Sequence, residues 1–223
     1  MLTRRELLSS LAVAPLAAEI PLLKKLVAPG TEIWHEQHCL SQESASGFRR
    51  LLNKEQSVVG HIRRGREKPS VILIPGVRQL SEARCEELLR RVQAGTWLIL
   101  ETGVCFSSVE QSEQQASLLK SAFDLEVLSP APVAASRKSQ TAYIAFVWPL
   151  RSLTRTFEAV TPIRCERSEA IAFFDNRPVS AKRSLGKGGL VYLGTMLGPA
   201  LFAEEREAHA IGRALLRSLW QRA

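Results

Sequence analysis

The chain of 223 residues has few aromatic residues, few cysteines and no long hydrophobic run. No apolar stretch reaches the ~18–20 residues that cross a bilayer, so we expect no transmembrane span. Its four cysteines are too few for a disulfide framework in a chain of this length, although one Cys39–Cys105 bridge stays open. Aromatic residues make up 6% and do not alternate with the scattered basic residues, so the net charge of +8 does not indicate a nucleic-acid partner.

The rest of the composition is that of an ordinary globular protein. Hydrophobic residues make up 45% and charged residues 23% of the chain. This length and composition predict one folded domain with a short tail.

The first 20 residues resemble an export signal. Arg4 and Arg5 precede a short apolar stretch, Leu7 to Ala18, that ends in small residues. Paired arginines before such a stretch resemble a bacterial twin-arginine signal, which implies an exported, periplasmic protein. The alternative is an amphipathic helix on a cytoplasmic protein. We expect residues 1–20 to be the signal, 21–30 a linker or short helix, and 31–223 the domain.

The clearest structural pattern is a strand, a helix and a second strand. Val71–Ile74 and Trp97–Leu100 are unbroken apolar runs, typical of strands that are buried on both faces. Between them, Ser81 can cap a helix that Gly95 can end. The apolar stripe of this helix consists of Cys85, Leu88, Leu89 and Val92. Such a βαβ unit predicts two parallel strands.

Further elements follow from the same periodicities. Strands are expected at 32–35, 57–62 and 142–148, and helices at 44–53 and 109–123. Short apolar runs alternating with turn residues from about 165 to 195 predict an antiparallel meander. A last helix is predicted from the spacing of Ala208, Ile211, Leu215 and Leu219.

Ligands of open α/β sheets collect at the carboxyl ends of the strands. In this sequence these ends are Pro75–Val77 and Thr102–Phe106, together with the end of the 32–35 strand. The ligand-binding candidates are therefore Gly76, Val77, Gly103, Val104 and His35.

Two of these ends resemble class I glutamine amidotransferase-like domains. The strand that ends in Pro75-Gly76 resembles their oxyanion region, and Gly103-Val104-Cys105-Phe106-Ser107 resembles their Gly-x-Cys-x-Gly nucleophile elbow, with serine for the last glycine. The resemblance implies an α/β fold, a three-layer sandwich with a flavodoxin-like, mostly parallel sheet and a C-terminal antiparallel extension. It also implies Cys105 as the catalytic candidate.

The C-terminal half resembles the non-catalytic branch of these domains. Residues 170–179 and 185–195 are similar to the closing segment of the trimerisation domain of family 42 β-galactosidases and of related exported bacterial domains. This resemblance implies a domain that binds a ligand or a protein partner, in a carbohydrate-related context, and that can form a homo-oligomer.

The glutaminase base is missing from its expected position. Amidotransferases carry His-x-Glu after a late strand, whereas this chain has Thr195-Met196-Leu197, and His209 lies deep in the last predicted helix. A cysteine without a base is mostly protonated at neutral pH, so the sequence favours a non-catalytic domain. The alternatives are a cysteine-dependent amidase or hydrolase, in which Cys105 uses His35 or His38, and a structural oligomerisation module.

The segment Trp34–Cys39 contains residue types that bind zinc. His35, His38 and Cys39 could combine with Cys105, but the H-x-x-H-C spacing matches no strong zinc signature. We therefore expect no metal site and no cofactor.

Overall fold

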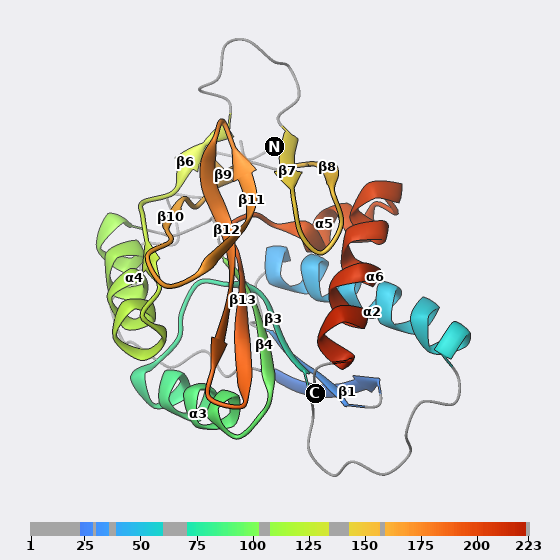
Figure 1. Ribbon diagram of the computed structural model, residues 1–223, viewed down its shortest axis with the longest axis horizontal. Helices are drawn as coiled ribbons and strands as arrows, with labels where there is room; N and C mark the ends of the chain where they lie inside the picture. The colour runs from blue at the N-terminus through green and yellow to red at the C-terminus, as the bar shows by residue number, and fades with distance from the viewer. Residues whose placement is uncertain are drawn as a thin grey trace, which may run out of the picture.

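The computed structural model describes residues 23–28, 30–35, 39–59, 71–102, 108–133, 143–156 and 159–221. At its centre is a nine-stranded mixed sheet with the order β1-β2-β3-β4-β13-β12-β11-β7-β8 (Figure 1). Its strands are β1 (Leu23–Ala28), β2 (Thr31–His35), β3 (Val71–Val77), β4 (Trp97–Thr102), β7 (Tyr143–Phe146), β8 (Ser152–Arg155), β11 (Glu169–Phe174), β12 (Arg177–Leu185) and β13 (Gly188–Leu193).

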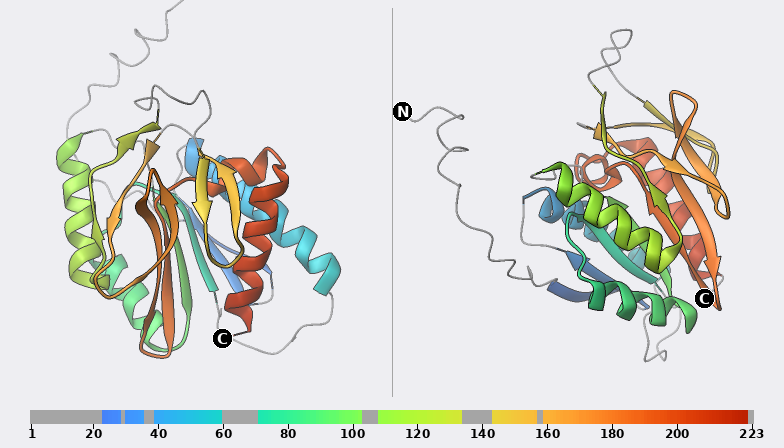
Figure 2. Two further views of the ribbon diagram at one scale, coloured as in Figure 1. Left: turned by 45° about the horizontal axis from the view of Figure 1, so that its top comes forward. Right: turned by 90° about the vertical axis from the view of Figure 1, so that its left-hand side faces the viewer.

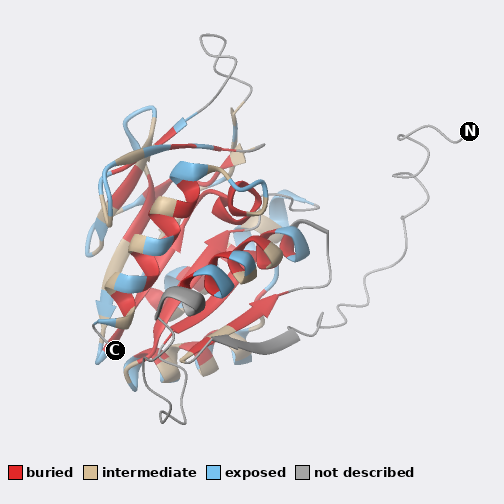
Figure 3. Ribbon diagram, turned by 90° about the vertical axis from the view of Figure 1, so that its right-hand side faces the viewer, coloured by how far each residue is buried: buried red, intermediate tan, exposed pale blue. Residues whose placement is uncertain are grey.

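Five helices of the described residues cover the two faces of the parallel part of this sheet. They are α2 (Cys39–Val59), α3 (Glu82–Gln93), α4 (Val109–Phe123), α5 (Leu197–Phe202) and α6 (Arg206–Trp220). Figures 1 and 2 show α3 and α4 on one face, and α2, α5 and α6 on the other. Each face has its own hydrophobic core, and Figure 3 shows the strands buried beneath helices that expose only their outer surfaces.

Two small ribbons lie outside the nine-stranded sheet. β5 (Glu126–Val127) pairs with β10 (Ile163–Arg164), and β6 (Ala131–Pro132) pairs with β9 (Ala159–Val160), both antiparallel. β10 lies beside β12 and packs in the core beneath α3 and α4, whereas β9 packs in the core of the other face.

The βαβ unit forms as its sequence predicts. β3 and β4 pair in parallel, with Val71 opposite Trp97. The Ser81 side chain accepts a hydrogen bond from the Arg84 N–H at 3.3 Å, which caps α3. Gly95 has φ +118°, a conformation that favours glycine and lets the chain leave the helix.

The predicted mostly parallel sheet is wrong. β2, β3, β4 and β13 form the parallel part, and every other pairing in the nine-stranded sheet is antiparallel. The α/β class and the antiparallel meander are confirmed, but its last strand, β13, also pairs in parallel with β4. An apolar run carries no strand direction, so its neighbour is decided by tertiary packing.

Two segments differ from their predicted secondary structure. Residues 57–59, predicted as the start of a strand, continue α2 to Val59, while residues 60–62 lie outside the described residues. Leu23–Ala28, expected within a linker or short helix, pairs with β2 as an edge strand. In both places a short run of apolar residues has no clear period, so the sequence does not separate helix from strand.

α2 is held against the helices that follow β13. Glu55 is buried on α2 and binds Arg217 of α6, with Arg217 Nε 2.9 Å from Glu55 Oε2. The backbones of α2 and α5 also approach closely, because a Cβ on Gly47 would lie 2.0 Å from the Gly198 carbonyl oxygen. No helix in the described part of the chain is both long and apolar enough to cross a membrane.

We expect Gly47→Ala to destabilise the fold by about 3 kcal/mol, the upper end for overpacking, because the added methyl group meets backbone atoms. Urea denaturation measures this change. The control is Glu43→Ala, an exposed position on the same helix, which should change the unfolding free energy by less than about 0.5 kcal/mol. Equal effects of the two substitutions would contradict the close packing of α2 on α5.

Candidate functional site

The carboxyl ends of the parallel strands meet at one edge of the sheet. His35, Val77 and Thr102 are the last residues of β2, β3 and β4, and Leu193 is the last residue of β13. Because these strands are neighbours and run in the same direction, their ends form the edge where α/β sheets bind ligands.

Glu101 is the central residue of this edge. Its side chain is fully buried, next to the end of β4, and points to the face covered by α2 and α5. The Ser44 hydroxyl of α2 donates a short hydrogen bond to Glu101 Oε2, and the Gly198 N–H of α5 donates to Oε1 at 2.8 Å. The backbone N–H groups of Leu197 and Gly76 also bind this carboxylate.

Burial dominates the electrostatics of this carboxyl group. Desolvation raises the pKa of Glu101 from 4.5 to about 7, although the hydrogen bonds from Ser44, Gly198, Leu197 and Gly76 act in the opposite direction. Both protonation states of Glu101 are therefore populated near neutral pH.

The donors that converge on Glu101 define what this part of the edge can do. Backbone N–H groups at a strand end and at the start of a helix are common binding groups for anionic ligands. Here three backbone N–H groups and one hydroxyl bind the chain's own carboxylate. An anionic ligand would have to displace Glu101 before it could use these donors.

The bend of β3 brings Gly76 toward Glu101. Gly76 has φ +58°, and a Cβ at this position would lie 3.2 Å from both Ser41 Cα and Met196 Cε. The Ser41 hydroxyl donates to the Pro75 carbonyl oxygen at 2.8 Å, which ties the bend to α2. Glycine is therefore required here by both conformation and space.

His35 lies at the same edge but already has a cationic partner. Arg49 Nη2 of α2 is 2.9 Å from His35 Nε2, and the imidazole is buried. Because a guanidinium can only donate, Nε2 accepts this hydrogen bond and carries no proton. In this arrangement the Nε2 lone pair is not available as a general base.

The end of β13, where the resemblance to amidotransferases would place His-x-Glu, is filled by buried, uncharged groups. Thr195 Oγ1 lies 2.9 Å from Thr156 Oγ1, and Met196 is buried. His209 is on α6, where its Nε2 binds the Leu201 carbonyl oxygen at 3.2 Å. Burial and then Lys54 lower the pKa of His209, so this side chain is neutral at pH 7 and serves the packing of α5 on α6.

Tyr192 is a large polar residue of β13, and its side chain lies on the face of the sheet opposite to the Glu101 side chain. It is fully buried in the core beneath α3 and α4. Burial raises the pKa of Tyr192, although the hydroxyls of Thr102 and Thr161 act in the opposite direction. Tyr192 therefore stays protonated and is a hydroxyl at the end of the parallel strands.

The predicted ligand-binding residues are only partly described. His35, Gly76 and Val77 lie on the neighbouring ends of β2 and β3, while their role in ligand binding stays a prediction. Gly103, Val104 and Cys105 lie outside the described residues, as does His38. Cys39 begins α2, but its side chain is not among those described, so the Cys105 nucleophile stays a prediction and the Cys39–Cys105 bridge stays open.

The described cysteines are buried or partly buried thiols. Cys85 and Cys165 are free, and burial, followed by the charge of Glu82, raises the pKa of Cys85 to about 11. Within the described ranges no group of three or more His, Cys, Asp or Glu side chains could hold a metal ion.

The residues at the centre of this edge are not among those predicted from the sequence. Glu101 had a usable signal, because a carboxylate directly follows Trp97–Leu100, a strand expected to be buried on both faces. Ser44 and Arg49 had none, since a polar residue on an amphipathic helix does not show which strand end it will meet.

Comparison with solved structures identifies proteins with a similar fold. The chain matches a cytoplasmic protein from Salmonella typhimurium with TM-score 0.55 and 9% identity, over 89% of this chain and 94% of that one. It matches an exo-β-1,4-mannosidase from Opitutaceae bacterium strain TAV5 with TM-score 0.53 and 13% identity, over 86% of this chain and 36% of the enzyme.

A β-galactosidase from Rahnella sp. R3 matches with TM-score 0.49 and 16% identity, over 68% of this chain. The chain corresponds to 22% of that enzyme's length. Neither a protein-family model nor a curated protein sequence matches the chain. The likeness to the Salmonella protein and the mannosidase is one of fold.

The raised pKa of Glu101 predicts a stability that falls as pH rises. Between pH 4.5 and about 7 the native state holds a proton that the unfolded state has lost, so the unfolding free energy decreases over this window. The whole effect of this group is about 3 kcal/mol, present below pH 4.5 and lost above pH 7. Urea denaturation across this pH range measures it.

The matched variant is Glu101→Gln, which cannot titrate. We expect the difference in unfolding free energy between the unsubstituted chain and Glu101→Gln to change by about 3 kcal/mol between these pH values. Glu113→Gln, an exposed position on α4, should show no such pH dependence. A constant difference for Glu101→Gln would mean that Glu101 titrates normally.

Proposed function

We propose that residues 31–223 form a non-catalytic domain of the class I glutamine amidotransferase-like type, which binds a ligand or protein partner. In this proposal residues 1–20 direct export to the periplasm, and residues 21–30 join the signal to the domain. The sheet corresponds to the flavodoxin-like core of a three-layer sandwich, extended by the antiparallel strands.

One observation carries the non-catalytic part of the proposal. The backbone N–H of Gly76, in the strand end that resembles the amidotransferase oxyanion region, converges with those of Leu197 and Gly198 on the buried Glu101 carboxylate. An oxyanion site needs such donors to be free for the charge that develops in the transition state. A carboxylate that already binds them favours a structural role for this edge.

The two described histidines support the same reading. His35 Nε2 accepts a hydrogen bond from Arg49, and His209 on α6 binds the Leu201 carbonyl oxygen. Neither imidazole is therefore arranged to take a proton from a thiol that follows β4.

The carbohydrate-related part of the proposal rests on the shared fold with the exo-β-1,4-mannosidase. This chain corresponds to 36% of that enzyme, so a domain of this fold accompanies a glycoside hydrolase there. We propose that the present domain acts together with a protein whose substrate is also a carbohydrate. Calorimetric titration with β-1,4-mannobiose and with galactose tests this part separately.

A cysteine-dependent amidase or hydrolase is the second candidate. Glu101 favours it, because this residue lies four positions before Cys105 in the chain and has a pKa of about 7, a value suited to proton transfer at neutral pH. In this alternative Cys105 would be held as a thiolate.

The ionisation of Cys105 separates the two candidates. We expect the alkylation rate of Cys105 in the folded protein to follow a pKa at or above the ordinary thiol value of roughly 8.5, because His35, His209 and Glu101 already have other hydrogen-bond partners. The measurement is the iodoacetamide rate against pH, with Cys105→Ser subtracting the contributions of the other cysteines. A pKa well below that value, together with hydrolysis of glutamine that is lost in Cys105→Ser, would overturn the non-catalytic proposal.

A further inference from the structure

Arg49 is a cationic residue of the carboxyl edge that has only a neutral partner. Its Nη2 lies 2.9 Å from His35 Nε2, which carries no proton. Its Nε is buried and has no hydrogen-bond partner. No carboxylate of the described residues forms an ion pair with this guanidinium. Within the described part of the chain, one imidazole is therefore its whole set of polar partners.

The sequence of α2 directs the Arg49 side chain toward the sheet. Ala45 lies four residues before Arg49 and Leu52 three residues after it, and both are buried in the core between α2 and the sheet. Residues at these spacings lie on the same side of a helix. His35 lies two residues after Ile33, which belongs to the same core, so its side chain is on the face of β2 that α2 covers.

The missing countercharge is unusual for a guanidinium in this position. Arg49 is only partly exposed, and removing a charged group from water is costly unless the charge is paired. Further along α2, the buried Glu55 has such a pair, with Oε2 2.9 Å from Arg217 Nε. At the carboxyl edge the Glu101 carboxylate is bound by Ser44 and by backbone N–H groups instead. The positive charge of Arg49 is thus left uncompensated by the described residues.

The donors of Arg49 suit one kind of ligand. A guanidinium has five N–H donors in one plane, and His35 accepts from one of them. Carboxylate and phosphate groups accept two parallel hydrogen bonds from such a plane, and the attraction is stronger where the surroundings exclude water. An oxyanion bound in this way does not have to displace Glu101.

We propose that Arg49 binds the carboxylate or phosphate group of a small-molecule ligand at the carboxyl edge of the sheet. His35 is a positioning residue, because its Nε2 accepts from Nη2 and holds the plane of the guanidinium. The inference rests on the proposed function, in which this domain binds a ligand, and it adds the chemical class of that ligand. The place agrees with the general rule that ligands of α/β sheets bind where parallel strands end.

NMR titration of the full chain tests the inference. The probes are inorganic phosphate and acetate, added at neutral pH and at constant ionic strength, and the readout is the arginine Nε–H region of the ¹H–¹⁵N spectrum. We expect the Arg49 signal, assigned by its loss in Arg49→Gln, to shift in a saturable way with a millimolar dissociation constant. Tighter binding of phosphate would indicate a phosphate ester as the ligand, and tighter binding of acetate a carboxylate. An Arg49 signal that neither anion shifts would overturn the proposal.

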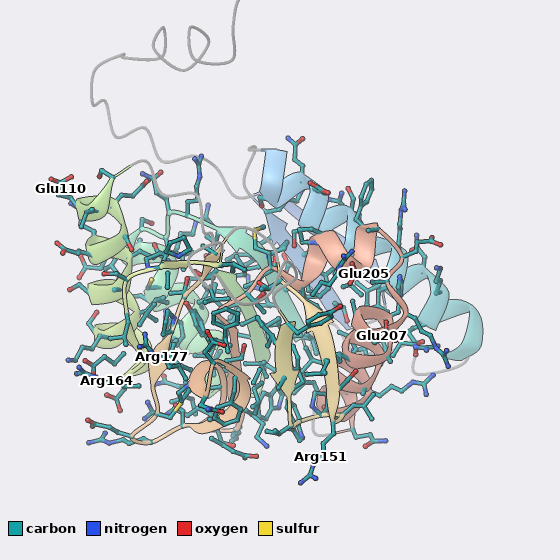
Figure 4. The ribbon with its side chains drawn as sticks, turned by 90° about the horizontal axis from the view of Figure 1, so that it is seen from above. Glu110, Arg151, Arg164, Arg177, Glu205 and Glu207 are labelled. Carbon is teal, nitrogen blue, oxygen red and sulfur yellow. The ribbon has the colours of Figure 1, made fainter. Side chains whose placement is uncertain are left out.

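The matched control for charge is Arg151→Gln. Arg151 is exposed, precedes β8 and points away from the body of the protein (Figure 4). In the sheet, β3, β4, β13, β12, β11 and β7 lie between β8 and β2, so this arginine is remote from His35. Its Nε–H signal should shift little and without saturation, since an exposed arginine attracts anions only weakly. Equal shifts of the Arg49 and Arg151 signals would show general charge attraction and would contradict a site.

Thermal unfolding extends the test to the variants. Phosphate stabilises folded proteins in general, so the measured quantity is the difference in its effect between variants. We expect phosphate to raise the unfolding midpoint of Arg151→Gln as much as that of the unsubstituted chain, and that of Arg49→Gln less. Arg49→Lys keeps the charge but not the two parallel donors, so it should bind about tenfold more weakly. An equal rise in all four proteins would overturn the proposal.

Failure of this inference can be told apart from failure of the proposed function. Absence of anion binding would remove the ligand class and leave the domain non-catalytic. A Cys105 thiol with a low pKa and glutamine hydrolysis would overturn the non-catalytic proposal without changing the Arg49 titration. The titrations with β-1,4-mannobiose and galactose are independent as well, because neither sugar carries an anionic group.

Discussion

A buried carboxylate organises the most constrained part of this protein. Glu101 joins β4 to α2 through Ser44, to α5 through Gly198, and to the bend of β3 through Gly76. Burying a carboxyl group is costly unless its oxygens are bound, and here hydrogen-bond donors from three other elements satisfy them. The close approach of α2 and α5 at Gly47 and Gly198 brings those donors within reach.

This arrangement has a direct consequence for chemistry at the carboxyl edge. The edge has the backbone geometry of a ligand site, with a bent strand, a glycine at positive φ and a helix that starts nearby. The Glu101 side chain takes the position that an anionic ligand of the backbone N–H groups would need, and Arg49 donates a hydrogen bond to His35. The bent strand, the glycine and the nearby helix start, which help to form reactive sites in enzymes, therefore contribute to packing in the described part of this protein.

The sheet divides into two regions with different surroundings. From β2 to β13 the strands run parallel between two helical layers, so both faces are buried. From β12 to β8 the pairings are antiparallel, and the outer face of the last hairpin is exposed. Among the described residues of the sheet region, the large exposed apolar side chains lie on this last hairpin.

Apolar spacing, caps and turn residues are enough to specify the local elements with strong periodicity. The strand–helix–strand unit from Val71 to Thr102, the helix Val109–Phe123 and the meander before α6 follow from apolar spacing, caps and turn residues. The same patterns also place His35, Gly76 and Val77 at one edge, since parallel neighbours end together.

The partners of these elements depend on packing between segments that are distant in the chain. The parallel pairing of β13 with β4, the extension of α2 to Val59 and the contact of Ser44 with Glu101 join segments that are distant in the chain. Side-chain periodicity reports which face of an element is buried, but it carries no information on which other element covers that face. Strand order, and with it the environment of Glu101, therefore emerged from packing.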